Sequence, residues 1–115
     1  MDLAGEKSKK FAIRIVRVYQ YLRTEKKEFV LSKQLLRSGT SIGANLAESK
    51  CAISRNDFAS KVYIALKETT ETMYWLELLY QTEYLTKKQY FSLCRDAADI
   101  RNILSATTRT MQRKV

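Results

Sequence analysis

The chain contains no histidine and no proline, and it has only three glycines and two cysteines among its 115 residues. The lack of histidine removes the commonest general base and metal ligand in proteins. Cys51 and Cys94 are too few for a structural zinc site and do not show the spacing of a disulfide framework. We therefore expect reduced packing thiols, no metal, no cofactor and no enzymatic activity.

The chain also lacks any apolar run of the roughly 18 to 20 residues that a membrane span requires. Its first residues, MDLAGEKSKKFAIR, have no apolar segment of the kind found in signal peptides. A content of 45% hydrophobic residues in 115 residues suits one domain with a modest core. These features predict a cytoplasmic protein with a single domain over residues 1–115 and no membrane partner.

The formal net charge is +9, and the positive charge is concentrated towards the two ends of the chain. Residues 1–55 hold 12 basic and 5 acidic side chains, whereas residues 56–83 hold 2 basic and 5 acidic ones. Residues 84–115 are again basic, with 7 basic against 2 acidic side chains. Such a charge favours a polyanionic partner such as RNA or DNA.

Apolar residues recur at steps of three and four along the whole chain, as Phe11, Ile15, Val18 and Leu22 illustrate. This period is typical of amphipathic helices. Helix starts are indicated by Ser54 followed by Asp57, and by Thr86 followed by Gln89. The sequence therefore predicts an all-α protein with helices at about residues 6–24, 29–52, 55–83 and 86–112. Short connections make an antiparallel up-and-down four-helix bundle the simplest architecture.

The third predicted helix has more apolar surface than one bundle seam requires. A second face gathers Ile64, Trp75, Leu78 and Leu79 with Glu68 and Glu71. Either a neighbouring subunit or a wide internal contact must cover this face. We therefore expect a homo-oligomer.

Two of the three glycines lie inside the second predicted helix, where each costs about 1 kcal/mol relative to alanine. Gly39, Gly43 and Ala47 recur every four residues and form a stripe without large side chains. A phosphate-binding loop is disfavoured because no Gly-Lys-Ser/Thr follows and no strand precedes the segment. The stripe predicts close packing of another helix.

The other edge of this helix is polar and carries Gln34, Arg37, Ser41, Asn45 and Glu48. Three interpretations are open: a solvated face, a small-ligand site, or a structural network. We favour the network, in which Arg37 pairs with Glu68 or Glu71 of the third helix, because those carboxylates lie on a half-apolar face.

Basic residues line the first and last predicted helices. The candidate nucleic-acid-binding residues are Lys7, Lys10, Arg14, Arg17, Arg101, Arg109, Arg113 and Lys114. If the two helices are neighbours, their basic faces would merge into one surface for phosphate backbones. The alternatives are a solvated charged face and a protein-binding scaffold. Exposure of Tyr63, Tyr74 and Tyr84 beside basic residues would favour nucleic acid, whereas an uncharged patch would favour a protein partner.

The segments QLLRSGTSIGANLAES and DFASKVYIALKETTETMYWLELL resemble the four helix bundle protein family, also called 23S rRNA intervening-sequence proteins after where some of its genes lie. The resemblance covers about residues 9 to 112 and includes the positions Arg37, Ser41, Ile42, Asn45, Glu48, Phe58, Ala65, Lys67, Glu68, Glu71, Trp75 and Leu76. Gly39 stands where the family pattern has alanine.

The resemblance implies an up-and-down four-helix bundle that assembles as a homopentameric ring, with no enzymatic activity attributed to it. More distantly, the architecture and charge are similar to those of the accessory protein of diversity-generating retroelements. That likeness implies association with a reverse transcriptase and with nucleic acid. The expected partners are therefore RNA or DNA, further copies of the chain, and a reverse transcriptase.

Overall fold

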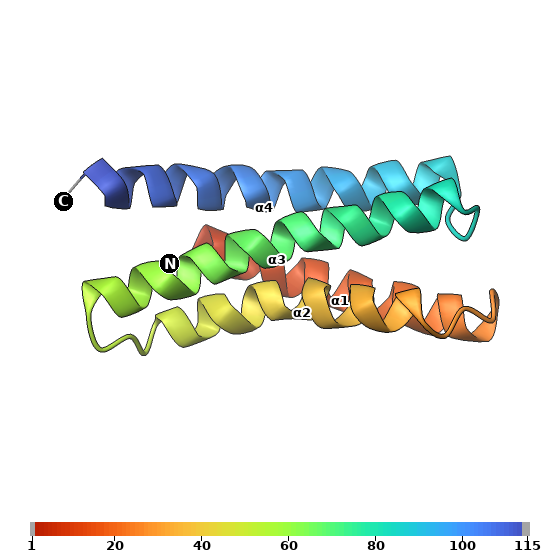
Figure 1. Cartoon of the computed structure of the whole chain (residues 1–115), viewed down its shortest axis with the longest axis horizontal. Coiled ribbons are helices and arrows are strands. Elements are labelled where there is room, and N and C mark those ends of the chain that lie inside the picture. The colour runs from red at the N-terminus through yellow and green to blue at the C-terminus, as the bar shows by residue number, and fades with distance from the viewer. Residues whose placement is uncertain (1, 114–115) are drawn as a thin grey trace.

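The computed structural model describes residues 2–113 and shows four helices that run back and forth along one long axis (Figure 1). They are α1 (Leu3–Thr24), α2 (Leu31–Ser49), α3 (Arg55–Gln81) and α4 (Lys87–Arg113). The molecule measures 47 × 22 × 21 Å along its principal axes. The predicted all-α class is confirmed.

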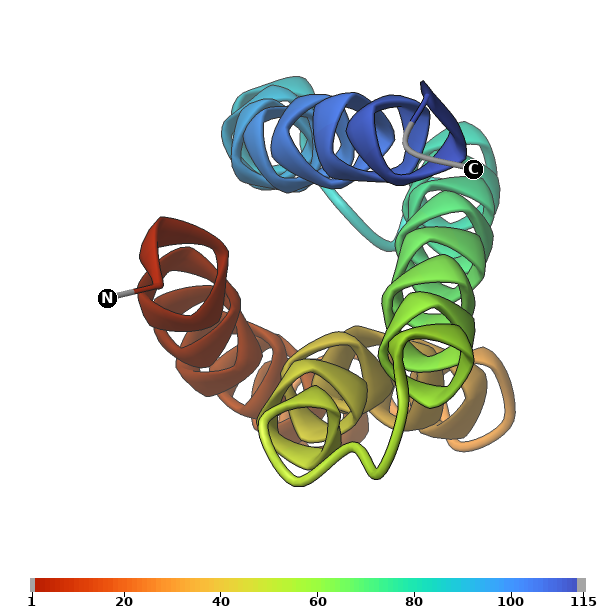
Figure 2. The ribbon, with the colours of Figure 1, turned by 90° about the vertical axis from the view of Figure 1, so that its left-hand side faces the viewer.

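Each helix contacts its neighbours in sequence, and α1 also contacts α4, which makes the arrangement consistent with the predicted up-and-down bundle. The contact between α1 and α4 is the least extensive of the four. In Figure 2 the near ends of α1 and α4 lie well apart, whereas α2 and α3 follow each other closely around the bundle. In the described residues no helix is long and apolar enough to cross a membrane.

Side-chain caps explain where α1, α3 and α4 begin. Asp2 accepts a hydrogen bond of 2.9 Å from the backbone N–H of Gly5, so α1 begins three residues earlier than predicted. Ser54 caps α3 through the N–H of Asp57 at 3.0 Å, as predicted. Thr86 and Gln89 exchange hydrogen bonds of 2.9 and 3.1 Å in the predicted capping box before α4.

α2 is shorter than the predicted range of 29–52 at both ends, and at its start a side chain outside the helix caps it. The buried carboxylate of Glu28 accepts hydrogen bonds from the N–H groups of Val30, Leu31 and Ser32 at 3.1, 2.8 and 2.6 Å. Burial alone would raise the pKa of Glu28, but these donors outweigh burial and lower it below the ordinary value of 4.5. Glu28 thus satisfies the first N–H groups of α2 and fixes its start.

The core lies along the inner faces of all four helices. Its largest fully buried apolar side chains are Phe11, Ile15, Leu22, Leu35, Ile42, Leu76, Leu79, Leu93, Ile100 and Leu104. Of the two covers expected for the second face of α3, the internal one applies to Leu79, because contacts within the bundle bury it completely. Trp75 also packs against the core, half-buried.

α1 packs closely on the small-residue stripe of α2. A Cβ atom added at Gly39 would lie 2.8 Å from Cγ2 of Ile15, which is closer than carbon atoms can approach. At Gly43 an added Cβ would lie 3.2 Å from Oγ of Ser8. The predicted packing therefore occurs at Gly39 and Gly43. It does not extend to Ala47, which is exposed, because Gly5, across the groove between α1 and α2, offers it no side chain.

Gly39→Ala will lower the free energy of unfolding by about 1–3 kcal/mol, because the new methyl group overlaps the Ile15 side chain. In an Ile15→Ala background the same change will instead raise stability by up to about 1 kcal/mol, through helix propensity alone. Urea denaturation of the four proteins in this double-mutant cycle measures the difference. A stabilising Gly39→Ala in the otherwise unchanged chain would contradict the close packing.

Glu28→Gln will destabilise the protein at neutral pH by about 1–2 kcal/mol, because it weakens the cap of α2. The lowered pKa means that the carboxylate's contribution is fully present above the unfolded-state value near 4.5 and is lost as the pH falls through the lower folded-state pKa. The difference in free energy of unfolding between the unchanged protein and Glu28→Gln must therefore become smaller at acidic pH. Urea denaturation at a series of pH values measures this difference, and Glu25→Gln, at an exposed position, is the control. A difference that does not change with pH would refute the role of the Glu28 carboxylate.

Candidate nucleic-acid interface

The four predicted basic residues of α1 divide into two pairs. Lys10 and Arg17 are exposed and form no ion pair with the other described residues. Arg14 instead donates to a carboxylate oxygen of Asp96 at 2.7 Å and to Oγ of Ser92 at 3.0 Å. Lys7 lies 4.0 Å from Asp99. Half of the predicted basic face is therefore partly neutralised by α4.

The predicted basic residues of α4 do not complete the surface of α1. Arg101 lies beside α3, with a guanidinium nitrogen 3.8 Å from the sulfur of Met73. Arg109 and Arg113 are exposed near the C-terminal end of α4, which extends past the start of α1 in Figure 1. Lys114 lies outside the described residues. The two faces do not merge as expected, because α4 presents Asp96 and Asp99 to α1.

Sequence reasoning missed a third exposed cation on α1. Lys9 lies next to Lys10 and, with Arg17, on the outward side of the helix. We call Lys9, Lys10 and Arg17 the α1 basic face. Ile13 and Val16 lie on the same outward side, with 50% and 38% of their surface exposed. The α1 basic face therefore combines three exposed cations with two accessible apolar side chains.

The three tyrosines that were expected to discriminate between partners differ in their surroundings. Tyr63 is half-buried and its hydroxyl accepts a hydrogen bond of 2.7 Å from Gln112. Tyr84 is half-buried against the core. Tyr74 is 57% exposed and packs edge-on against Trp75 at 5.1 Å between ring centroids. The one exposed tyrosine of the three thus lies within an aromatic pair on α3 and not on the α1 basic face.

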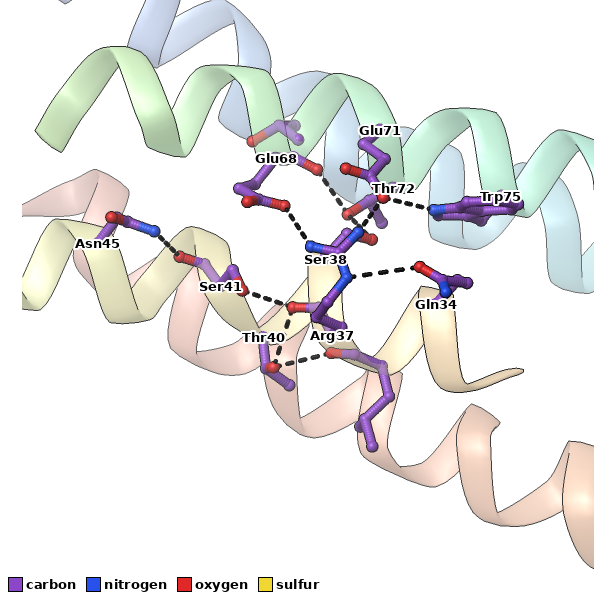
Figure 3. A network of polar contacts seen from close by, with 12 residues as sticks. Gln34, Arg37, Ser38, Thr40, Ser41, Asn45, Glu68, Glu71, Thr72 and Trp75 are labelled. Carbon is purple, nitrogen blue, oxygen red and sulfur yellow. Dashed lines mark hydrogen bonds and ion pairs between the residues drawn. The ribbon is translucent and has the colours of Figure 1, made fainter. Parts of the chain in front are cut away.

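Next to Trp75 lies a polar cluster that joins α2 to α3 (Figure 3). Arg37 forms ion pairs with Glu71 and, at 3.4 Å, with Glu68. The indole N–H of Trp75 donates to the same carboxylate of Glu71 at 2.9 Å. Because 47% of the Arg37 side chain is exposed, solvent weakens these ion pairs. The cluster fixes the side-chain positions of Arg37 and Trp75 at the outer α2–α3 seam.

The rest of the predicted polar stripe does not form one continuous network. Ser41 donates to the carbonyl of Arg37 at 2.6 Å, and Asn45 donates to the carbonyl of Ser41 at 2.8 Å. Both bonds stay within α2, because these short side chains reach the preceding turn of their own helix. Glu48 pairs with Lys61 of α3 at 2.8 Å. The interhelical contacts of the stripe are thus two separate ion-pair groups.

The sequence did not predict the buried hydrogen bond between Ser38 and Thr72. The fully buried hydroxyls of Ser38 and Thr72 share a hydrogen bond of 2.9 Å between α2 and α3. In the sequence, this contact is indicated only by hydroxyl residues at positions where the helical period predicts buried apolar side chains. The bond removes the penalty of burying both groups.

Cys94 and Tyr90 have raised pKa values. Burial raises the pKa of the Cys94 thiol. Burial and the hydrogen bond to Cys94 raise the pKa of Tyr90 to about 12. Cys51 is a free thiol but is exposed, so its expected role in packing is wrong. Among residues 2–113 there is no group of three or more cysteines and carboxylates that could hold a metal ion.

The fold and these contacts define a class: an all-α, four-helix protein with an exposed basic face on its first helix and an ion-paired seam between its second and third helices. Residues 4–106 match the family described as 23S rRNA-intervening sequence protein, and the chain belongs to this family. The resemblance noted in the sequence is thereby confirmed.

A crystal structure of a protein of unknown function from Bacteroides thetaiotaomicron, assigned to the S23 ribosomal protein family, is similar to this chain. The two share 54% sequence identity with a TM-score of 0.91, over 92% of this chain and 98% of the other. A search of curated proteins gives no match.

Proposed function

We propose that this protein is a non-enzymatic, cytoplasmic, homo-oligomeric protein that associates with nucleic acid by binding phosphate backbones through the α1 basic face. The observation that carries the proposal is the exposure of Lys9, Lys10 and Arg17 on one side of a single rigid helix, without ion-pair partners among the described residues. Cations held in this way can neutralise phosphates, which releases counterions from the nucleic acid.

The charge of the whole chain supports the same partner. A net charge of +9 attracts polyanions over distances longer than any single contact. Arg109 and Arg113 add a second exposed basic site at the C-terminal end of α4. Contacts of this kind give affinity with little sequence preference. RNA and DNA both present phosphate backbones, so both are tested.

Self-association is proposed through the outer surface of α3. Tyr74 is exposed there beside Trp75, and the adjacent cluster neutralises Arg37 with two carboxylates. Tyrosine and tryptophan are enriched in the contacts between protein chains. We propose that copies of the chain meet here in a ring of five. The same observation favours the second candidate function, a protein-binding scaffold or accessory subunit of a reverse transcriptase.

Binding of a labelled RNA hairpin and a DNA duplex will weaken steeply as the salt concentration rises. The double variant Lys10→Glu/Arg17→Glu will reduce binding to both probes and lower the slope of log affinity against log salt by about two. Fluorescence anisotropy measures both effects. Arg14 is left unchanged because its loss would break the contact with Asp96.

The matched control is Arg55→Glu/Lys67→Glu, which reverses two exposed cations of α3 and alters the net charge equally. Equal loss of binding in both double variants would show that only total charge matters. Absence of binding at low salt would refute the nucleic-acid proposal and leave the scaffold as the better account.

Tyr74→Glu will reduce the mass of the particle in solution, because it places a charge in the proposed contact between copies. Light scattering after size-exclusion chromatography will give five chain masses for the unchanged protein and fewer for the variant. Gln20→Glu, on the exposed side of α1, is the control and should leave the mass unchanged. A monomeric unchanged protein, or an unaffected Tyr74→Glu variant, would contradict this assembly.

A further inference from the structure

A groove lies between α1 and α4, next to the α1 basic face. Its floor is apolar and consists of Val18, Leu85 and Leu93. Arg14, Arg17, Tyr21 and Gln89 complete its lining. The volume of about 290 Å³ is just below the usual range for ligand clefts, roughly 300–1,000 Å³. The groove therefore suits a small, partly apolar group.

The polar groups of the groove differ in how far they are already satisfied. Arg14 is bound to Asp96 and Ser92, so its charge is partly neutralised. Arg17 has no ion pair among the described residues. Gln89 uses its side-chain oxygen to accept from the N–H of Thr86, which leaves its amide N–H groups as donors. The groove thus offers one available cation and one amide donor beside an apolar floor.

From this juxtaposition we infer that the groove takes an unpaired base of single-stranded nucleic acid, with Arg17 on the adjacent phosphate. This inference rests on the proposed function and specifies the form of nucleic acid that the protein binds. A base has apolar faces that suit Val18 and Leu93, and polar edges that suit the Gln89 amide. Its phosphate carries the charge that Arg17 complements.

Single strands fit this arrangement better than duplexes do. In a duplex the base faces are stacked and the pairing edges are occupied, so only phosphates are available at the rim of the groove. A duplex can therefore reach Arg17 but not the floor. In a single strand both the base and its phosphate are accessible, so both kinds of contact form together.

The test compares two labelled strands of about 12 nucleotides, oligo(dT) and an abasic strand with the same phosphates. If bases enter the groove, oligo(dT) will bind at least about fivefold more tightly than the abasic strand, the equivalent of one weak stacking contact. Equal affinity for the two strands would overturn the inference, while salt-dependent binding of both would leave the proposed function standing. Failure of both to bind at low salt would overturn the two together.

A matched pair of variants tests whether the base binds in the groove. Gln89→Glu keeps the side-chain oxygen that caps α4 but introduces a negative charge and removes the amide donors. Gln20→Glu makes the same charge change on the exposed side of α1, one turn from Arg17 and outside the groove lining. Gln89→Glu will weaken oligo(dT) binding at least about fivefold more than Gln20→Glu does. An equal loss of oligo(dT) affinity in the two variants would overturn the inference. Thermal unfolding followed by circular dichroism verifies that both variants are folded.

Discussion

The packing of α1 against the glycines of α2 is the constraint on which the rest of the molecule depends. Ile15 occupies the space that a Cβ atom at Gly39 would need, so the two helices lie in close contact at their middle. This contact holds the inner side of α1 against the core and turns Lys9, Lys10 and Arg17 outwards. The loss of helix propensity at the glycines is offset by buried contacts that a larger residue would prevent.

Three of the helix–helix seams are held by different interactions. The α1–α2 seam is closely packed at Gly39, whereas the α2–α3 seam adds the buried Ser38–Thr72 bond and the ion pairs of Arg37. The α1–α4 seam has the least extensive contact and carries the ion pairs of Arg14 and Lys7. The groove lies next to these ion pairs, and residues of both helices line it.

Much of the fold follows from local patterns in the sequence. The apolar period located four helices, and Ser54 and the Thr86–Gln89 pair marked two of their starts because caps need specific side chains at fixed spacing. The Glu28 cap was not foreseen, because it lies among charged residues and reaches α2 only after Lys27 adopts a left-handed backbone conformation, with φ of 55°.

The candidate site was less predictable because it depends on partners distant in sequence. The pairing of Arg37 with Glu68 and Glu71 could be foreseen, since a charge on a half-apolar helix face needs a partner. The pairing of Arg14 with Asp96 depends on the relative rotation of α1 and α4, which a single sequence does not reveal. For the same reason the periodicity did not show that Leu79 faces inwards.

Hydrogen exchange measured by mass spectrometry, with and without a single-stranded RNA, tests the central claim most directly. The account predicts slower exchange on binding in α1 around Lys10 to Tyr21 and in the first turns of α4, with α3 around Tyr74 unchanged. Slower exchange confined to α3, or no change in α1, would contradict the assignment of the α1 basic face as the nucleic-acid surface.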